Sequence, residues 1–254
     1  MGAPYGAFFL TGINSSMKYT TKTMIKLAIL FSTAIVGLVY WFMNGATLWQ
    51  FMFAFVMLSL VSRIANAGYH RWLTHNQFQP TWIGRKIMLY FMVLTGEAPP
   101  GHYVIAHLNH HKYTDEDGDP HGPKQIGFWN LALGKYGEVK PAFMRNYARN
   151  KDAQWVTEHY WRLYLVNWIV FAFINPYLNI WLACMFCWSW LQMINLNWRG
   201  HGGTKGTPTN LGRISNLFMG GEDYHKNHHD NPGQLVMGKW DTTGKYLVPW
   251  LLAK

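Results

Sequence analysis

The sequence predicts an all-α integral membrane protein in which four transmembrane helices form two hairpins beneath a cytoplasmic helical cap. Charged residues make up only 13 % of the 254 positions, whereas Trp, Tyr and Phe make up 17 %. An ordinary soluble domain carries about 25 % charged residues. Two stretches of 36 residues, 27–62 and 163–198, contain no charged residue at all. The histidines gather outside both stretches, in short clusters.

Each charge-free stretch is long enough for two membrane crossings. A spanning helix needs about 20 apolar residues, so 36 residues fit a helical hairpin better than one span. Turn signals lie near the middle of each stretch, "NGA" at 44–46 and "INPYLN" at 174–179. The expected spans cover about residues 24–43, 47–66, 160–174 and 177–197. We expect them to belong to one membrane domain that covers residues 1–254.

The positions of the basic residues predict the orientation. Every Lys and Arg lies outside the two charge-free stretches, including Lys18, Lys22 and Lys26 before the first. A charge at the bilayer centre costs about 2.5–3.5 kcal/mol on insertion scales. The positive-inside rule then places both termini, region 67–159 and region 198–254 in the cytoplasm. A signal peptide at 18–43 is disfavoured because no small-residue cleavage site follows and a second apolar stretch does.

The net charge of +10 predicts an anionic partner. No nucleic-acid-binding module accompanies the charge, which favours membrane lipid or an acidic protein over nucleic acid. The only two cysteines, Cys184 and Cys187, form a C-x-x-C inside the apolar run "IWLACMFCWSW". Apolar surroundings make a thiol hard to ionise, so we expect both to pack in the core without a redox role.

Nine of the twelve histidines form clusters beside the predicted spans. The segments are "GYHRWLTH", "HLNHH", "NLNWRGH" and "HKNHH". They contain His70, His75, His107, His110, His111, His201, His225, His228 and His229. On a helix, residues three and four apart share a face, so each H-x-x-H-H triplet is expected to project together. His70 and His75 are five apart, which leaves two interpretations: either they bind different metals or the helix loosens between them.

Two H-x-x-H-H triplets in one chain indicate metal binding. At this histidine content, one triplet arises by chance roughly 0.03 times per chain, so two are not coincidence. All-imidazole ligation suits iron, copper, zinc or nickel, and nine ligands exceed the needs of one ion. The cap is therefore expected to hold two metals. Carboxylates that could orient the imidazoles lie near the clusters: Glu97, Asp115, Asp119, Glu222 and Asp223.

The motifs "GYHRWLTH", "HLNHH…DPH" and "EDYHKNHH" resemble the three histidine boxes of the membrane fatty-acid desaturases. The resemblance covers residues 24–235 and is strongest to the stearoyl-CoA and acyl-lipid delta-nine type. It implies a di-iron centre whose ligands are the nine clustered histidines. Asn197 in "NLNWRGH" matches the family's Asn that meets one iron through a water. His102, His121 and His159 fall outside the set, with His121 the closest to it, in "DPH".

The resemblance also implies a reaction. Such enzymes reduce O2 with two external electrons and remove two hydrogens from adjacent methylenes of an acyl chain held in an apolar tunnel. The chain carries no cytochrome-like "HPGG" segment, so the electrons are expected from a separate ferredoxin or cytochrome. Ile105, Ala106, Leu108 and Asp223 depart from the acyl-CoA desaturase pattern. The acyl chain is therefore expected to be lipid-, carrier- or CoA-linked.

The same sequence features fit two other kinds of function. A lipid hydroxylase, ketolase or decarboxylase could use the same di-iron centre, because substrate placement divides these reactions. A non-catalytic membrane metal carrier is less well supported. A transporter places ionisable residues inside its spans, and residues 27–62 and 163–198 contain no ionisable acid or base.

Overall fold

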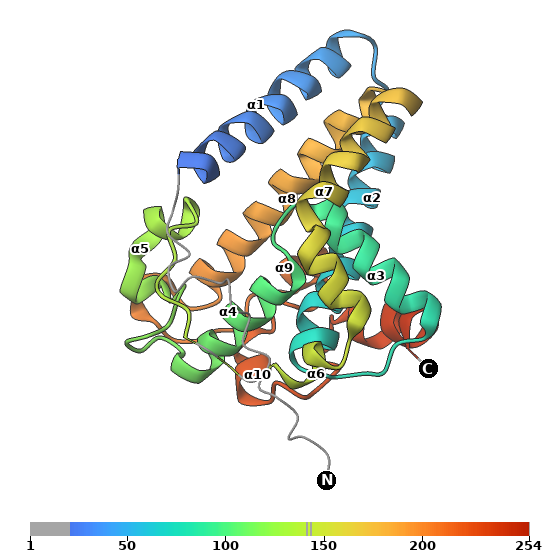
Figure 1. Ribbon diagram of the computed structural model, residues 1–254. Coiled ribbons are helices and arrows are strands. Elements are labelled where there is room, and N and C mark those ends of the chain that lie inside the picture. The colour runs from blue at the N-terminus through green and yellow to red at the C-terminus, as the bar shows by residue number, and fades with distance from the viewer. Residues whose placement is uncertain (1–20, 141, 143, 254) are drawn as a thin grey trace.

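Two long helical hairpins dominate the structure (Figure 1). The computed structural model describes residues 21–140, 142 and 144–253. The first hairpin is α1 (Thr21–Met43) with α2 (Leu48–Asn66), and the second is α7 (Lys151–Ile174) with α8 (Tyr177–Arg199). The Tyr177 ring lies 6.2 Å from the ring of Trp41 and 6.3 Å from that of Tyr40. The tips of both hairpins therefore lie together, at the top of Figure 1.

Local sequence explains where the hairpins turn. Gly45 adopts a left-handed φ of 82°, a conformation that glycine reaches without steric cost. Thr47 then caps α2 in a reciprocal capping box with Gln50. The expected bounds of α1, α2 and α8 agree with the structure to within a few residues. The predicted span at 160–174 lies within α7, which begins nine residues earlier, at Lys151, after its cap Asn150.

Three of the four predicted spans coincide with helices that could cross a membrane by their length and composition. Within the described residues, the helical segments long and apolar enough to cross a membrane are Thr23–Met43, Leu48–Thr74 and Tyr177–Arg199. The fourth predicted span, in α7, is not among them because charged residues such as Asp152 and Glu158 occupy the first half of that helix. The four-span count and the cytoplasmic orientation stay predictions. Lys18, used for the orientation, lies outside the described residues.

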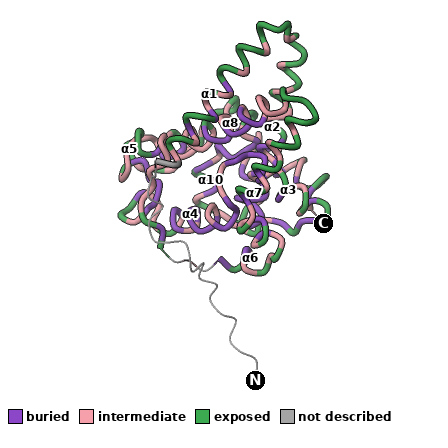
Figure 2. Tube along the Cα trace, turned by 45° about the horizontal axis from the view of Figure 1, so that its top comes forward, coloured by how far each residue is buried: buried purple, intermediate pink, exposed green. Residues whose placement is uncertain are grey.

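The hairpin surface is apolar on its outside, as a lipid-facing surface must be. Phe42, Trp49 and Phe173 are 70 %, 76 % and 88 % exposed. Figure 2 shows exposed chain around the tips and buried chain toward the opposite end. Cys184 and Cys187 on α8 are free and partly buried, and the Cys187 thiol faces the Leu30 carbonyl on α1 at 3.8 Å. This position agrees with the predicted packing role.

Shorter helices form the cap at the other end of the hairpins. They are η1 (Ala67–Thr74), α3 (Trp82–Thr95), α4 (Pro100–Tyr113), α5 (Pro123–Ala132), α6 (Arg145–Ala148), η2 (Gly203–Lys205), α9 (Arg213–Met219), α10 (His225–Asp230) and η3 (Thr243–Leu252). A large apolar core joins the cap to α2, α7 and α8. Gly68 shows how closely it packs, since a Cβ there would lie 2.2 Å from Cε of Met92. The cap is thus held firmly against the hairpins.

Candidate metal centre

The first histidine pair lies on a π-helix that continues α2. η1 spans Ala67–Thr74, and the His75 N–H donates to the His70 carbonyl at 3.1 Å, an i→i+5 bond. In this wider turn, two residues five apart come one above the other, as they cannot in an α-helix. Their ring centroids lie 4.9 Å apart. Of the two interpretations that the sequence left open, the loosened helix is therefore the one observed.

The nine clustered histidines come together from four parts of the chain and divide into two groups. Within each group, one ligand atom from every residue lies within 4.8 Å of the others. The five-histidine group contains His70, His75, His107, His111 and His228, and the four-histidine group contains His110, His201, His225 and His229. All nine predicted histidines are thus brought to one place, between η1, α4, α8 and α10.

We expected the three histidines of each H-x-x-H-H triplet to project together, but the structure divides each triplet between the two groups. Helix geometry explains this division. His107 and His111 are four apart on α4 and enter the same group, whereas His110 enters the other. Successive residues are about 100° apart around a helix, so the adjacent His110 and His111 face different sides. On α10 the pattern is reversed: His225 and His229 join one group and His228 the other. Both triplets therefore bridge the two groups.

The ring nitrogens are spaced as ligands of one ion would be. Neighbouring Nε2 atoms within the groups lie 2.7–3.3 Å apart, including His201 to His225 at 2.7 Å and His70 to His228 at 2.9 Å. Two imidazoles bound at right angles at about 2.1 Å would place their nitrogens roughly 3 Å apart. The buried Nε2 of His75 has no hydrogen-bond partner in the described chain. The donor set therefore fits two metal ions.

Buried carboxylates orient one histidine from each of three segments. Glu222 accepts from His70 Nδ1 at 2.6 Å, Asp119 from His110 Nδ1 at 2.8 Å, and Asp115 from His201 Nδ1 at 2.8 Å. A proton fixed on Nδ1 leaves the lone pair of Nε2 free for a metal. Three of the five expected carboxylates thus lie where an orienting partner should. The other two do not: Asp223 accepts from Ser215, and Glu97 lines a cavity.

Burial favours the neutral imidazole that a metal ligand must be, as His107 and His225 show. Burial first, and the neighbouring His111 second, hold the pKa of His107 well below its ordinary value. Burial and then His201 do the same for His225. For Glu222, burial alone would raise the pKa, but the charges of Arg71 and His70 lower it to about 2. The Glu222 carboxylate is therefore ionised.

Sequence reasoning missed a buried arginine at the centre of this network. Arg71 is fully buried and pairs with Glu222 at 2.7 Å and with Asp241 at 3.0 Å. It also donates to the Leu235 carbonyl at 2.6 Å. Arg71 thereby ties the first histidine segment to the last. Its presence in "GYHR" was the available signal, whereas nothing in the sequence marked Asp241 as its partner.

The three remaining histidines have different surroundings. His121 stacks on His110 with centroids 4.4 Å apart and forms a further group with His110 and Asp119. His102 lines the cavity described next. His159 is bonded to the Trp155 carbonyl of its own helix, away from the centre. His121 is thus the one of the three that touches the centre.

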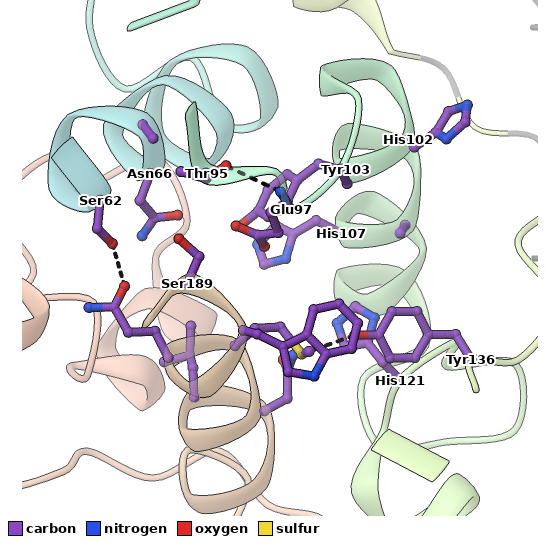
Figure 3. A pocket seen from close by; sticks show the side chains of 18 of the residues that line it. Ser62, Asn66, Thr95, Glu97, His102, Tyr103, His107, His121, Tyr136 and Ser189 are labelled. Carbon is purple, nitrogen blue, oxygen red and sulfur yellow. Dashed lines mark hydrogen bonds between the residues drawn. The ribbon is translucent and has the colours of Figure 1, made fainter. Parts of the chain in front are cut away.

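A cavity of about 140 Å³ opens beside the five-histidine group (Figure 3). Residues from α2, the α3–α4 segment, α4 and α8 line it, among them His107 and Asn197. Asn197 lies on α8, four residues before His201, and its side chain lines this cavity. The cavity would bring a small or slender molecule directly against the histidines.

The fold and the site define a class: a helical membrane protein with two groups of histidines able to hold metal ions, next to a cavity. Residues 47–235 match the fatty acid desaturase family. The chain is 31 % identical over 205 residues to Delta-9 desaturase-like 5 protein of Arabidopsis thaliana, which covers 70 % of this chain and 64 % of that protein. The chain belongs to the fatty acid desaturase family.

Two further relatives carry more specific names. Delta-9 acyl-lipid desaturase 1 of Arabidopsis thaliana is 29 % identical over 186 residues, 64 % of this chain and 58 % of that protein. The sn-1 stearoyl-lipid 9-desaturase of Anabaena variabilis is 25 % identical over 184 residues, 64 % of each chain. The match therefore spans less than two thirds of the length of these curated relatives.

Proposed function

We propose that the chain is an O2-dependent fatty acyl desaturase, an oxidoreductase that introduces a double bond into a saturated acyl chain with two irons and external electrons. One observation carries the proposal: nine histidines, six of them buried, form groups of five and four beside a cavity, in a chain of the desaturase family. Imidazole ligation suits iron. Bound iron would supply the oxidising power needed to remove hydrogen from an unactivated methylene.

The residues of the chain have distinct roles in this proposal. The five-histidine group would hold one iron and the four-histidine group the other, the latter with Asn197 through a water. Glu222, Asp119 and Asp115 fix the rings through Nδ1. The surrounding core excludes water, so that the oxidising centre acts on the substrate alone.

A lipid-linked acyl chain is the substrate best supported. Two relatives are named as acyl-lipid and stearoyl-lipid desaturases. Ile105 and Ala106, which replace the charged pair expected for a CoA head group, are 8 % and 9 % exposed and belong to the core. Buried apolar side chains offer nothing to a charged head group, which favours lipid- or carrier-linked chains over CoA esters.

Electrons would come from a separate protein such as a ferredoxin or cytochrome. The excess of Lys and Arg, 22 against 12 Asp and Glu, would steer an acidic donor to the cytoplasmic face. Turnover with such a donor should fall as ionic strength rises. Turnover that does not respond to salt would contradict this docking mode.

We also propose four spans with both termini in the cytoplasm. Support comes from Phe173 and Ile174 at the end of α7, which are 88 % and 67 % exposed as lipid-facing residues would be. Gly45→Cys and Lys239→Cys can be compared in a chain whose two native cysteines are replaced by Ser. In intact cells an impermeant thiol reagent should label position 45 and spare position 239. The reverse pattern would refute the orientation.

Expression of the full chain in a host of known lipid composition tests the function. New double bonds in the host's fatty acids, read by mass spectrometry, are expected with the native chain and absent with His228→Ala. His159→Ala is the matched control because it lies outside the centre. Products with an added oxygen, or terminal alkenes one carbon shorter, would instead indicate hydroxylation or decarboxylation. Activity that survives complete removal of metal would overturn the proposal.

A further inference from the structure

The cavity beside His107 contains more polar groups than a plain hydrocarbon chain can use. Its lining includes apolar side chains such as Trp190, Met193 and Leu196. It also includes the polar side chains of Ser62, Asn66, Glu97, Ser189 and Gln192. A buried polar group without a hydrogen-bond partner is costly, so polar groups in a pocket point to a polar ligand.

Ser189 is the clearest of these polar groups. It is 4 % exposed, and its hydroxyl has no hydrogen-bond partner among the described residues. Ser62, in contrast, donates to the Oε1 atom of Gln192 across the cavity wall. Figure 3 shows the polar ends of Asn66, Glu97 and Ser189 directed into the cavity from α2, the α3–α4 segment and α8. The hydroxyl of Ser189 is therefore free to bond a ligand.

Glu97 is held in the cavity by its backbone. It follows Gly96, whose left-handed φ of 62° ends α3 and leaves no room for a Cβ, because one would lie 2.8 Å from the Tyr164 ring. The Glu97 N–H donates to Thr95 Oγ1 at 3.4 Å. Burial raises the pKa of Glu97 to about 7, against the opposing charge of Lys26. Because the cavity removes much of the solvation of this carboxylate, a ligand that donates a hydrogen bond to Glu97 would stabilise it.

We propose that the pocket selects an acyl chain that carries a hydroxyl group near the carbons that react. Glu97 accepts the hydroxyl hydrogen, and Ser189 donates to the hydroxyl oxygen. The two side chains are specificity determinants of the proposed acyl substrate, and this inference rests on that proposed function. Neither residue is a metal ligand, so both can be changed while the nine histidines stay in place.

Ligand binding to the purified full chain tests the inference without turnover. The probes are 18-carbon acyl chains, either unsubstituted or with one hydroxyl at successive positions, competing with a fluorescent acyl probe. The best hydroxylated isomer should bind at least about tenfold more tightly than the unsubstituted chain. Ser189→Ala and Glu97→Leu should each remove most of that preference. Glu97→Gln, which keeps an acceptor oxygen and nearly the same shape, should retain part of it.

Two control variants show whether the loss is specific. Ser59→Ala removes another buried hydroxyl from α2, outside the cavity, and Glu158→Leu removes an exposed carboxylate from α7. Both should leave the preference unchanged. If Glu97→Leu fails to fold, Ser189→Ala still decides the question. A hydroxyl preference that stays undiminished in Ser189→Ala overturns the inference.

The outcomes separate this inference from the proposed function. If the unsubstituted acyl chain binds as tightly as every hydroxylated isomer, the inference is overturned, even when the protein introduces a double bond into the unsubstituted acyl chain. A hydroxyl preference that persists while no acyl chain gains a double bond overturns the proposed function and supports the pocket assignment. Faster unsaturation of the hydroxylated isomer in the expression host, lost in Ser189→Ala, supports both.

Discussion

The Oε2 atom of Glu222 lies 2.6 Å from Nδ1 of His70, although 152 positions separate the two residues. The second oxygen of the same carboxylate accepts from Arg71 at 2.7 Å. One side chain from the segment before α10 thus sets both the ring orientation of the first histidine and the position of the arginine beside it. The metal centre depends on contacts that join its first and last segments.

Glu222→Gln should lower bound metal and turnover about 10- to 100-fold, because an outer partner of a metal-binding histidine typically has that effect. The amide keeps the shape but cannot serve as an ionised acceptor for His70. Metal analysis of purified protein together with product formation measures the change. Glu158→Gln, on the exposed side of α7, is the control. Unchanged metal content would contradict the orienting role.

The division into five and four predicts different effects for neighbouring histidines. His228→Ala removes a ligand of the first group and His225→Ala one of the second, so each should deplete mainly one of two metal ions. Turnover should be lost in both, because the reaction needs the pair. The number of ions per chain, measured on each variant, is the test. Equal loss of both ions from both variants would show that the groups do not bind independently.

Arg71→Met should destabilise the fold by about 3–5 kcal/mol, since it leaves Glu222 and Asp241 as buried carboxylates without a counter-charge. Unfolding in detergent, followed by circular dichroism, measures the loss. Arg149→Met, at an exposed position, should change little. The double variant Arg71→Met with Asp241→Asn should recover part of the stability. No recovery would mean that the ion pair is not the cause.

Glu97 predicts a pH dependence of stability. Its pKa is about 7 in the fold against an ordinary value of 4.5, so the folded state favours the protonated form. The ionised form destabilises the fold, and this penalty grows as pH rises from 4.5 to 7 and is complete above 7. Glu97→Gln should therefore be more stable than the native chain at pH 8 and equal to it near pH 4. A difference that is the same at both values would contradict the assignment.

The two hairpins and the nine clustered histidines could be predicted from the sequence because both produce local sequence patterns. Charge-free runs mark the apolar stretches, and H-x-x-H-H marks ligand spacing. The sequence did not show that the helix of the predicted span at 160–174 begins earlier, because absence of charge marks an apolar stretch, whereas α7 starts after its cap, Asn150.

Other features could not be predicted because they depend on long-range packing. The π-helix η1 brings the rings of His70 and His75 together. No local sequence propensity predicts a π-helix at this position. The pairing of Arg71 with Asp241 joins residues 170 positions apart. The walls of the cavity come from segments spread between α2 and α9, so the sequence did not show that the side chains of Ser189 and Glu97 face the same cavity.

The ion pairs of Arg71 with Glu222 and Asp241 also have a consequence for biosynthesis. During translation this cation is made long before Glu222 and Asp241, so it waits without either counter-ion until the later segment emerges from the ribosome. A nascent chain interrupted before Asp241 would bury an uncompensated guanidinium or leave the first histidine segment open. We expect either defect to raise the unfolded fraction of the product, which cellular proteases degrade.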